Sequence, residues 1–448
     1  MTVDLEGWGR TPRRRSPVHA PRDEAELRAL LASGTRLIAR GGGRAYGDAA
    51  LAAERGAVVS MRRFDRLLAL DSARGHLIAE AGVVLGDLVR AVLPRGWFPW
   101  VTPGTQFATL GGLVAADVHG KNHHRVGSFG AYVRWVELMG SEGHVIRASR
   151  ETEPELFAAT LGGMGLTGVI LRAQIALQPV ETAWIREELV AADGLASGMA
   201  AFDAAEAAAD APPYSVAWID CLNRGPRLGR TLLHLGRHAT AAELPPGSTP
   251  FETPSRPRFA VPLDAPAWTL STPLMRAFNR LYWWAGRRKT GAGARLVGWE
   301  PFFYPLDALT GWNRLYGRRG FLQMQCVLPP ETARDALADM LGESSASGLG
   351  YLAVLKRFGA QESVFSFPRA GWTLALDMPA SRKGHALCDR LECIAAAAGG
   401  RFYLAKDARL PRSRFDATEP RAAALRALRT ARGLDTRFAS QQSERLAL

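Results

Sequence analysis

The stretch that decides the fold is Arg40-Gly41-Gly42-Gly43-Arg44-Ala45-Tyr46-Gly47-Asp48. It follows a short apolar run at residues 36–40 that is typical of a β-strand. Three successive glycines after a strand let backbone N–H groups turn inward and approach a diphosphate closely. The loop differs from the dinucleotide-binding GxGxxG pattern, because Tyr46 stands where the helix should begin. A tight turn without a ligand is the alternative that this loop alone leaves open.

Two further regions rich in small residues extend the same chemistry. The first contains Pro103-Gly104-Thr105, Thr109-Leu110-Gly111-Gly112 and Asp117-Val118-His119-Gly120-Lys121-Asn122-His123-His124; the second contains Gly127-Ser128-Phe129-Gly130 and, later, Gly162-Gly163-Met164-Gly165-Leu166-Thr167-Gly168. Small residues at this density let a long, flat ligand lie against the backbone. The Thr105 and Thr109 hydroxyls and the glycine amides are suited to phosphate. We expect no core helix within residues 102–130, because the side chains are too small.

The histidines in this region raise the alternative of a zinc site. His119 and His123 are four residues apart, which would place both on one face of a helix. However, no carboxylate occupies the position that an HExxH motif requires, and the flanking glycines disfavour a helix. We therefore predict no metal site.

The remaining pattern predicts a mixed α+β chain that changes character near residue 184. We expect helices at residues 22–33, 86–92, 155–159 and 191–209, and strands at 36–40, 58–61, 77–81, 134–139, 145–148 and 214–220. Strands and helices alternate again over residues 320–398. The sequence therefore predicts a domain boundary after residue 184.

The basic residues of the chain are unevenly divided between arginine and lysine. The net charge is +13, and only five of the 56 basic residues are lysines: Lys121, Lys289, Lys356, Lys383 and Lys406. In such a background, a lysine can mark a place where a compact ammonium group is required. No nucleic-acid-binding motif is present, so we predict no nucleic-acid partner. The basic excess instead favours a phosphate-bearing ligand or an anionic membrane surface.

The cysteines and the lack of long apolar segments indicate the cellular compartment of the protein. Cys221, Cys326, Cys388 and Cys393 form no CxxC pair, which favours reduced structural thiols. Residues 1–15 lack the apolar core of a secretory signal, and no uncharged apolar stretch of about 18 residues exists. We expect a cytoplasmic protein, with peripheral membrane association left open.

Several motifs in order resemble one family of flavoenzymes. The stretches that carry the resemblance are Gly7-Trp8-Gly9-Arg10-Thr11, the loops quoted above, Trp312-Asn313-Arg314-Leu315-Tyr316-Gly317, Gly320-Phe321-Leu322-Gln323-Met324-Gln325 and Ala405-Lys406-Asp407-Ala408-Arg409. They resemble the vanillyl-alcohol-oxidase superfamily and, within it, the decaprenylphosphoryl-β-D-ribose 2′-oxidase family of arabinan and cell-wall biosynthesis. The resemblance implies a PCMH-type FAD-binding domain in two parts, residues 1–184 and 401–448. It also implies a substrate domain at 185–400, built on an antiparallel sheet covered by helices.

The resemblance also implies which residues bind the cofactor. FAD would contact residues 40–48 and the following residues: Gly104, Thr105, Thr109, Leu110, Gly111, Gly112, Ala116, Asp117, Val118, His119, Ile170 and Tyr403. Many relatives bind FAD covalently through a histidine in the first glycine loop. This chain has Tyr46 there, which implies non-covalent binding.

The implied substrate pocket contains Lys121, Trp218, Gln323, Gln325, Lys356 and Lys406. Lys406 would lie by the flavin N1/C2 edge, where a cation stabilises the anionic reduced flavin. The implied reaction is hydride transfer from the sugar C2–H to flavin N5, with Lys406 or His119 as the base for the hydroxyl proton. Without the resemblance, Lys406 reads as a surface lysine in a turn.

The implied partners are a polyprenyl-phosphate-linked pentose, quinone or oxygen as the electron acceptor, and a reductase for the keto product. Three positions depart from the family's best-known members: Ala375 replaces a cysteine, Thr373 an asparagine and Phe303 a tyrosine. These changes bear on which sugar or lipid fits.

Two other functions remain open. One is an aldonolactone or sugar-alcohol oxidase of the same superfamily with a water-soluble substrate; the other is a basic binding protein without catalysis. Aromatic and basic residues alternate over residues 268–289, which suits a lipid headgroup interface. The alternative for that segment is a core helix with a solvated basic end.

Overall fold

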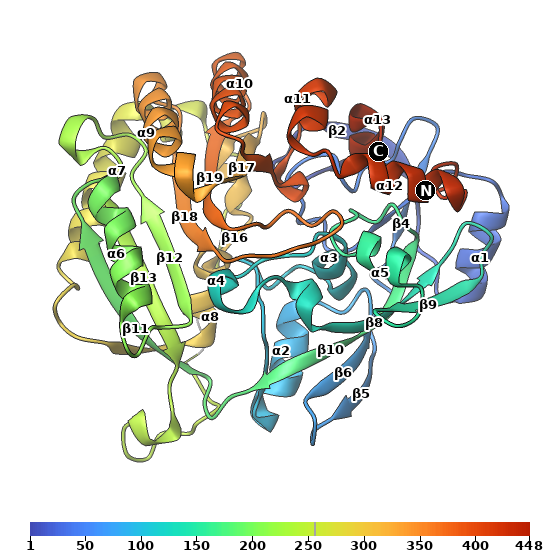
Figure 1. Cartoon of the computed structure of the whole chain (residues 1–448), viewed down its shortest axis with the longest axis horizontal. Coiled ribbons are helices and arrows are strands. Elements are labelled where there is room, and N and C mark those ends of the chain that lie inside the picture. Colours follow the sequence, from blue (N-terminus) through green and yellow to red (C-terminus); the bar gives the residue numbers. More distant parts are fainter. Residues whose placement is uncertain (255–256) are drawn as a thin grey trace.

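The protein is described by a computed structural model that covers residues 1–254 and 257–448. Two small sheets form the half of the molecule that contains the glycine loops (Figure 1). In the four-stranded sheet the order is β1-β2-β4-β3, with β1 Thr2–Glu6, β2 Arg13–His19, β3 Leu37–Arg40 and β4 Ala57–Ser60. In the second sheet the order is β5-β6-β10-β8-β9, with β7 paired to β10; the bounds are β5 Leu67–Asp71, β6 His76–Glu80, β7 Trp97–Pro99, β8 Val133–Met139, β9 Val145–Ser149 and β10 Val169–Pro179.

An eight-stranded antiparallel sheet forms the other half. Its order is β15-β11-β13-β12-β18-β19-β17-β20, with β11 Trp184–Ala192, β12 Tyr214–Ile219, β13 Thr231–His238, β15 Arg295–Gly298, β17 Phe321–Leu328, β18 Leu352–Phe358, β19 Gly371–Pro379 and β20 Arg401–Phe402. A short parallel pair, β14 Phe259–Ala260 and β16 Leu309–Thr310, lies apart from it. Together with the helices, these sheets confirm the predicted α+β class.

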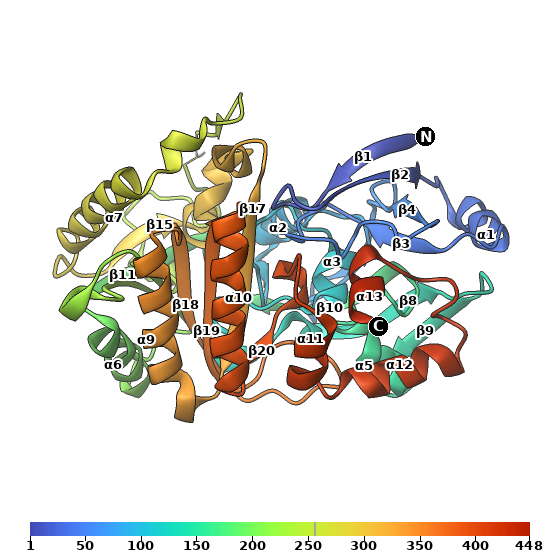
Figure 2. The same ribbon diagram turned by 90° about the horizontal axis from the view of Figure 1, so that it is seen from above.

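The helices cover the sheets unequally. Their bounds are α1 Glu24–Ala32, α2 Leu85–Val92, α3 Leu110–Ala115, α4 His123–Val126, α5 Pro154–Thr160, α6 Leu195–Ala207, α7 Thr272–Arg287, α8 Trp299–Phe303, α9 Pro330–Ser347, α10 Arg382–Ala397, α11 Arg412–Thr418, α12 Ala422–Ala431 and α13 Gln441–Leu446. Figure 2 shows α6, α9 and α10 along one face of the large sheet, with α7 across the other.

Strand alternation explains why the two faces of the large sheet differ. On β13, Leu233 and Leu235 join the core on the face that α6 covers, whereas Leu232 points to the opposite face and packs with Trp218 and Leu189. The first face is therefore a closed hydrophobic core, and the second is free to line a site.

The C-terminal segment returns to the glycine-loop half. Its helices α11, α12 and α13 lie over that half (Figure 1), and the Leu37 amide donates to the Arg437 carbonyl at 2.7 Å. Further upstream in the segment, the Tyr46 amide donates to the Ala405 carbonyl at 2.8 Å. This contact places Lys406 next to the first glycine loop.

Two sequence expectations about helices were wrong. Residues 102–130 contain α3, whose Leu110, Leu113 and Val114 are fully buried, because three large apolar side chains suffice for a one-and-a-half-turn core helix. The helix expected at 191–209 begins only after Gly194, since Ala191 and Ala192 complete strand β11. The helices expected at 22–33, 86–92 and 155–159 are confirmed within two residues at each end.

Gly47 tests the contact between the glycine loop and the C-terminal segment. A Cβ at this position would lie 2.0 Å from the Asp407 carbonyl oxygen and 2.6 Å from Ala408 Cα, both backbone atoms that cannot move aside cheaply. We expect Gly47→Ala to lower the free energy of unfolding by about 1–3 kcal/mol and to reduce FAD content. Chemical denaturation and the flavin-to-protein absorbance ratio measure both.

The matched control is Gly342→Ala in α9, where a Cβ meets no atom within 4 Å. That change should raise stability by up to roughly 1 kcal/mol, because alanine favours a helix interior. Equal effects of the two substitutions would contradict the proposed contact.

Candidate functional site

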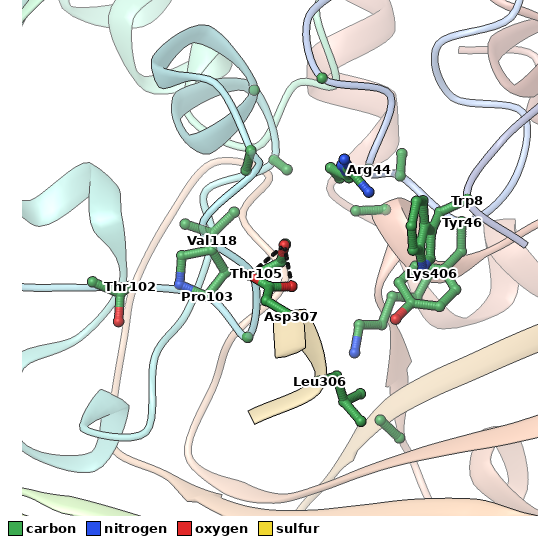
Figure 3. A pocket seen from close by; sticks show the side chains of 18 of the residues that line it. Trp8, Arg44, Tyr46, Thr102, Pro103, Thr105, Val118, Leu306, Asp307 and Lys406 are labelled. Carbon is green, nitrogen blue, oxygen red and sulfur yellow. Dashed lines mark hydrogen bonds between the residues drawn. The ribbon is translucent and has the colours of Figure 1, made fainter. Parts of the chain in front are cut away.

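A cavity of about 640 Å³ lies between the glycine loops and the free face of the large sheet. This volume is within the range of small-molecule and cofactor sites. Figure 3 shows its centre, where Arg44, Trp8, Tyr46 and Lys406 face Thr105 and Asp307. On the glycine-loop side, the predicted residues that line it are Gly41, Gly42, Gly43, Arg44, Ala45, Tyr46, Gly104, Thr105, Thr109, Gly111, Gly112, Ala116, Val118 and Ile170.

The glycines present bare backbone to this cavity. A Cβ on Gly41 would lie 1.9 Å from Thr109 Oγ1, and one on Gly42 would lie 2.3 Å from the Phe107 carbonyl oxygen. The two glycine loops are therefore pressed together, and larger residues would separate them. Gly104 is the opposite case: a Cβ there meets nothing within 4 Å, so its backbone is open to a ligand.

Arg44 supplies a positive charge at the same place. Its guanidinium carbon lies 4.3 Å from the Trp8 ring centroid and 4.9 Å from that of Phe107. Its Nε is buried without a hydrogen-bond partner among the described residues, and burial lowers its pKa. An enclosed cation without a bonded partner fits the phosphates of a dinucleotide.

Asp307 and Trp8 are lining residues that the sequence analysis did not find. The Thr105 hydroxyl donates to Asp307 Oδ1 at 3.0 Å (Figure 3). The backbone N–H of Gln106 donates to Asp307 Oδ2 at 2.8 Å. Thr105 thus lines the cavity with its hydroxyl bonded to Asp307, and its predicted contact with phosphate stays a prediction. Nothing local in the sequence indicates that Asp307 reaches across 202 positions to this loop.

The sheet side of the cavity carries the predicted substrate residues. Trp218, Gln323, Gln325, Lys356, Tyr403, Lys121 and Lys406 all line it. Gln325 Nε2 donates to Thr373 Oγ1 at 2.9 Å, while its Oε1 is buried without a partner among the described residues. An unpaired carbonyl oxygen in a cavity wall requires a donor such as a ligand hydroxyl or N–H.

The cavity lysines have depressed pKa values. Burial, aided by the charges of Lys406 and Lys121, lowers the pKa of Lys356 to about 7. Burial also lowers the pKa of Lys121 to about 8, and its ammonium donates to the Phe302 carbonyl and lies 4.3 Å from the Phe302 ring centroid. Three lysines in one cavity therefore compete for protons, and an anionic ligand would relieve that competition.

The positive charge of Lys406 is stabilised by the carboxyl of Asp377, a residue that was not predicted from the sequence. Asp377 is completely buried, accepts a hydrogen bond from the Gln323 amide, and has a pKa raised by burial. Burial lowers the pKa of Lys406, and the charge of Asp377 partly restores it. The Lys406 ammonium nitrogen lies 5.5 Å from the Tyr46 ring centroid and points into the cavity (Figure 3).

His119 does not reach the cavity. It is packed among Phe358, Phe367 and Tyr403, and its Nε2 lies 2.9 Å from Gln325 Nε2. Because an amide NH₂ donates, His119 Nε2 is the acceptor and the ring proton resides on Nδ1. Burial lowers the pKa of His119 well below its usual value. His119 thus lies behind Gln325, which it orients, and its predicted contact with the ligand stays a prediction.

Five other predicted cofactor residues also lie behind the cavity wall. Arg40 donates to the Glu6 and Ala50 carbonyls, Gly47 packs on Asp407, Asp48 pairs with Arg445, Leu110 belongs to the core, and Asp117 accepts from Ser128, Gly130 and Gln361. These contacts show how the five residues shape the loops around the cavity. Their predicted contacts with the cofactor stay predictions.

The histidine spacing that raised the zinc alternative does not persist in three dimensions. Helix α4 begins at His123, whereas His119 lies outside it in a bridge with Ser128. His123 Nε2 is 2.8 Å from Gln361 Oε1. In the described part of the chain, no group of three His, Cys, Asp or Glu side chains could hold a metal ion.

The far end of the cavity contains a polar group that no sequence pattern indicated. Glu187 is buried and accepts from Arg295 Nη2 at 2.6 Å, and His234 Nδ1 lies 2.7 Å from its other oxygen. These residues stand on β11, β15 and β13. The cavity wall thus crosses seven strands, about 29 Å at the usual strand spacing.

The three positions that depart from the family lie in this wall. Thr373 Oγ1 accepts from Gln325 and donates to the Cys326 carbonyl at 2.8 Å, so it fixes a lining side chain. Ala375 and Phe303 line the cavity directly. Phe303 packs against Phe98 and Tyr214.

Comparisons with known proteins agree with a flavin site. The FAD binding domain family matches residues 16–149. The chain is 35% identical, over its full length and 98% of the relative, to a Mycolicibacterium smegmatis protein named decaprenylphosphoryl-beta-D-ribose oxidase. It is 36% identical to an uncharacterized Streptomyces coelicolor protein over 82% of this chain and all of that protein. It is also 32% identical to cytokinin dehydrogenase 6 of Oryza sativa over 29% of this chain and 27% of that protein.

Proposed function

Since the chain belongs to the decaprenylphosphoryl-β-D-ribose oxidase family of FAD-dependent oxidoreductases, we propose that it oxidises the 2′-hydroxyl of a polyprenylphosphoryl ribose to a ketone. The observation that carries this proposal is that bare glycine loops and three lysines line one cavity, with Lys356 on the sheet, Lys121 in the loop before α4 and Lys406 in the C-terminal segment. A dinucleotide fits the first part and an anionic, hydroxyl-bearing substrate fits the second.

The glycine loops supply the cofactor subsite. Gly41, Gly42 and Gly104 offer backbone to an extended dinucleotide, and Arg44 offers an unpaired guanidinium to its diphosphate. When bound, FAD supplies the acceptor for the hydride from the sugar carbon. We infer non-covalent binding, because Tyr46 replaces the histidine that tethers FAD in many relatives.

Lys406 is the residue we propose to hold the hydroxyl proton. A depressed pKa leaves part of its amine population neutral near physiological pH, so Nζ can accept a proton and afterwards carry the positive charge. The same charge stabilises negative charge that develops beside it. The negative charge of Asp377 raises the pKa of Lys406 and so stabilises the protonated amine, although Lys406 is buried.

Gln325 and Lys356 orient the substrate. Gln325 Oε1 is free to accept from a sugar hydroxyl, and His119 with Thr373 fixes the amide that carries it. Lys356 supplies a cation for the phosphodiester, and apolar Val354, Leu352 and Trp218 continue the wall toward the lipid. Thus the sugar lies near Lys406 and the lipid lies toward the far end of the sheet.

A water-soluble sugar or lactone is not the favoured substrate, because the match to the M. smegmatis protein spans the full chain. For reoxidation we propose quinone or oxygen as the acceptor, with a reductase to consume the keto product. No helix in the described ranges is long and apolar enough to cross a bilayer. We propose a cytoplasmic location with peripheral contact to the membrane that holds the substrate.

Anaerobic reduction of the bound flavin tests the reaction and the role of Lys406. Farnesylphosphoryl ribose should bleach the oxidised flavin, whereas free ribose and aldonolactones should not. Lys406→Met should slow bleaching roughly 10²- to 10⁴-fold, because the amine that takes the hydroxyl proton is lost.

Lys383→Met is the control, since Lys383 is exposed on α10. Bleaching by the lactone but not by the phosphoryl ribose would refute the proposed substrate. A Lys406→Met rate equal to that of the unchanged enzyme would remove Lys406 from the reaction.

The pKa of Lys356 predicts how substrate affinity depends on pH. A phosphodiester keeps its charge throughout the neutral range, so only the protein titrates. Binding favours protonated Lys356, which is already half deprotonated near pH 7. The dissociation constant of farnesylphosphoryl ribose should therefore rise about tenfold between pH 7 and pH 8.5.

Lys356→Met should flatten most of this dependence, with a residual slope from Lys121, whose pKa is about 8. Lys383→Met should retain the full slope. Anaerobic flavin titrations at several pH values measure the constant, and an undiminished slope in Lys356→Met would contradict the assignment.

A further inference from the structure

Helix α7 presents an apolar face to the outside of the molecule. Leu274, Phe278 and Leu281 follow the i, i+4, i+7 spacing of one helix face, and Phe278 and Leu281 are 54% and 61% exposed. Trp268, in the turn just before the helix, is 69% exposed. Apolar side chains gathered in this way on a surface mark an interaction site.

The opposite face of α7 is firmly held by the large sheet. Asn279 is buried and its amide donates to Asp220 Oδ1 at 2.9 Å. Gly286 approaches Leu232 so closely that a Cβ would lie 2.3 Å from it. The helix is therefore fixed in orientation, and its outward apolar face is not free to rotate into the core.

The segment that carries this face has charges of only one sign. Residues 265–299 contain no Asp or Glu and six basic residues: Arg276, Arg280, Arg287, Arg288, Lys289 and Arg295. The Arg288 guanidinium lies 3.6 Å from the Trp284 ring centroid at the end of the helix. Arg295 is committed to Glu187, and Arg287 lies 3.6 Å from the exposed Asp193. Aromatic and apolar groups flanked by arginine are typical of residues that enter an anionic lipid surface.

The same helix closes the far end of the cavity. Tyr282 lines the cavity while remaining 39% exposed, and its ring lies 5.0 Å from that of Trp218. Helix α7 therefore carries both a cavity residue, Tyr282, and the outward apolar side chain next to it, Leu281.

We propose that α7 with Trp268 is a docking surface for an anionic lipid bilayer, from which the lipid-linked substrate passes beside Tyr282 into the cavity. The second half of this statement rests on the proposed function; the docking itself does not. A second copy of the chain is a poorer occupant, because a two-fold contact through α7 would bring two sets of like charges together.

Sedimentation of the FAD-loaded enzyme with vesicles tests the docking without reference to catalysis. We expect binding to phosphatidylcholine vesicles that contain phosphatidylglycerol, and weaker binding to phosphatidylcholine alone. Phe278→Ser/Leu281→Ser should reduce the partition coefficient roughly tenfold or more, since two inserted side chains are lost. Arg280→Gln/Arg288→Gln should remove most of the preference for the anionic lipid.

Leu67→Ser/Leu68→Ser is the matched control. These leucines are 42% and 41% exposed on β5, in the other half of the molecule (Figure 1). This variant should bind vesicles as the unchanged enzyme does. Thermal unfolding of all variants shows whether they fold alike.

The outcomes separate docking from the enzyme's substrate. If the unchanged enzyme ignores anionic vesicles, or if the α7 and β5 variants bind equally, docking by α7 is refuted. A fall from dimer to monomer on Phe278→Ser/Leu281→Ser in light scattering would assign the face to a second copy instead. If docking holds, the α7 variant should oxidise soluble farnesylphosphoryl ribose normally but vesicle-borne decaprenylphosphoryl ribose several-fold more slowly. If the unchanged enzyme binds anionic vesicles but oxidises neither the soluble nor the vesicle-borne substrate, the proposed function is refuted and the docking surface is not.

Discussion

The contact between the first glycine loop and the returning C-terminal segment is the constraint on which the site depends. Arg445 binds Asp48 at 2.8 Å and Asp407 at 2.7 Å, which ties two acidic loop residues to one guanidinium. Burial of two carboxylates is tolerated here because a single cation and several amides satisfy them. Lys406 adjoins Asp407, so this ion-pair network sets the position of the cavity's central amine. Asp48 thus serves the site without touching it.

The two faces of the large sheet have different roles: one packs in the hydrophobic core, and the other lines the cavity. One face is closed by α6, α9 and α10 over a continuous apolar core, and this rigid packing fixes each strand register. The other face places side chains from successive strands along a single wall, from Gln325 through Lys356 and Trp218 to Glu187. Along that wall polar Gln325 and Lys356 are followed by apolar Leu352 and Trp218, which suits a sugar phosphate followed by a lipid, before the wall ends at the Glu187–Arg295 ion pair.

Site features that depend on residues adjacent in the sequence could be predicted, whereas those that depend on contacts between distant segments could not. The glycine loops were predicted because close backbone approach requires glycine. The pocket lysines were predicted from the family resemblance, with which the scarcity of lysine elsewhere agrees. Asp307, Glu187 and Arg295 reach the cavity only through long-range strand pairing and loop packing, which no local pattern encodes. That His119 lies behind Gln325 likewise follows from its tight packing against Phe358 and Phe367. For residues 268–289, the sequence left open a lipid headgroup interface or a core helix with a solvated basic end. The outward face of α7 is fixed only by the contacts of Asn279 with Asp220 and of Gly286 with Leu232, which no local pattern encodes.

The C-terminal segment holds Lys406 at the cavity beside the first glycine loop, and we propose that its charge stabilises the reduced flavin. The midpoint potential of the bound flavin, measured by equilibration with a reference dye in the unchanged enzyme and in Lys406→Met, tests it most directly. The account predicts a potential lower in Lys406→Met by roughly 30 mV or more, which for a two-electron couple is a tenfold loss of stabilisation of the reduced state. An unchanged potential, with FAD still bound, would contradict the claim.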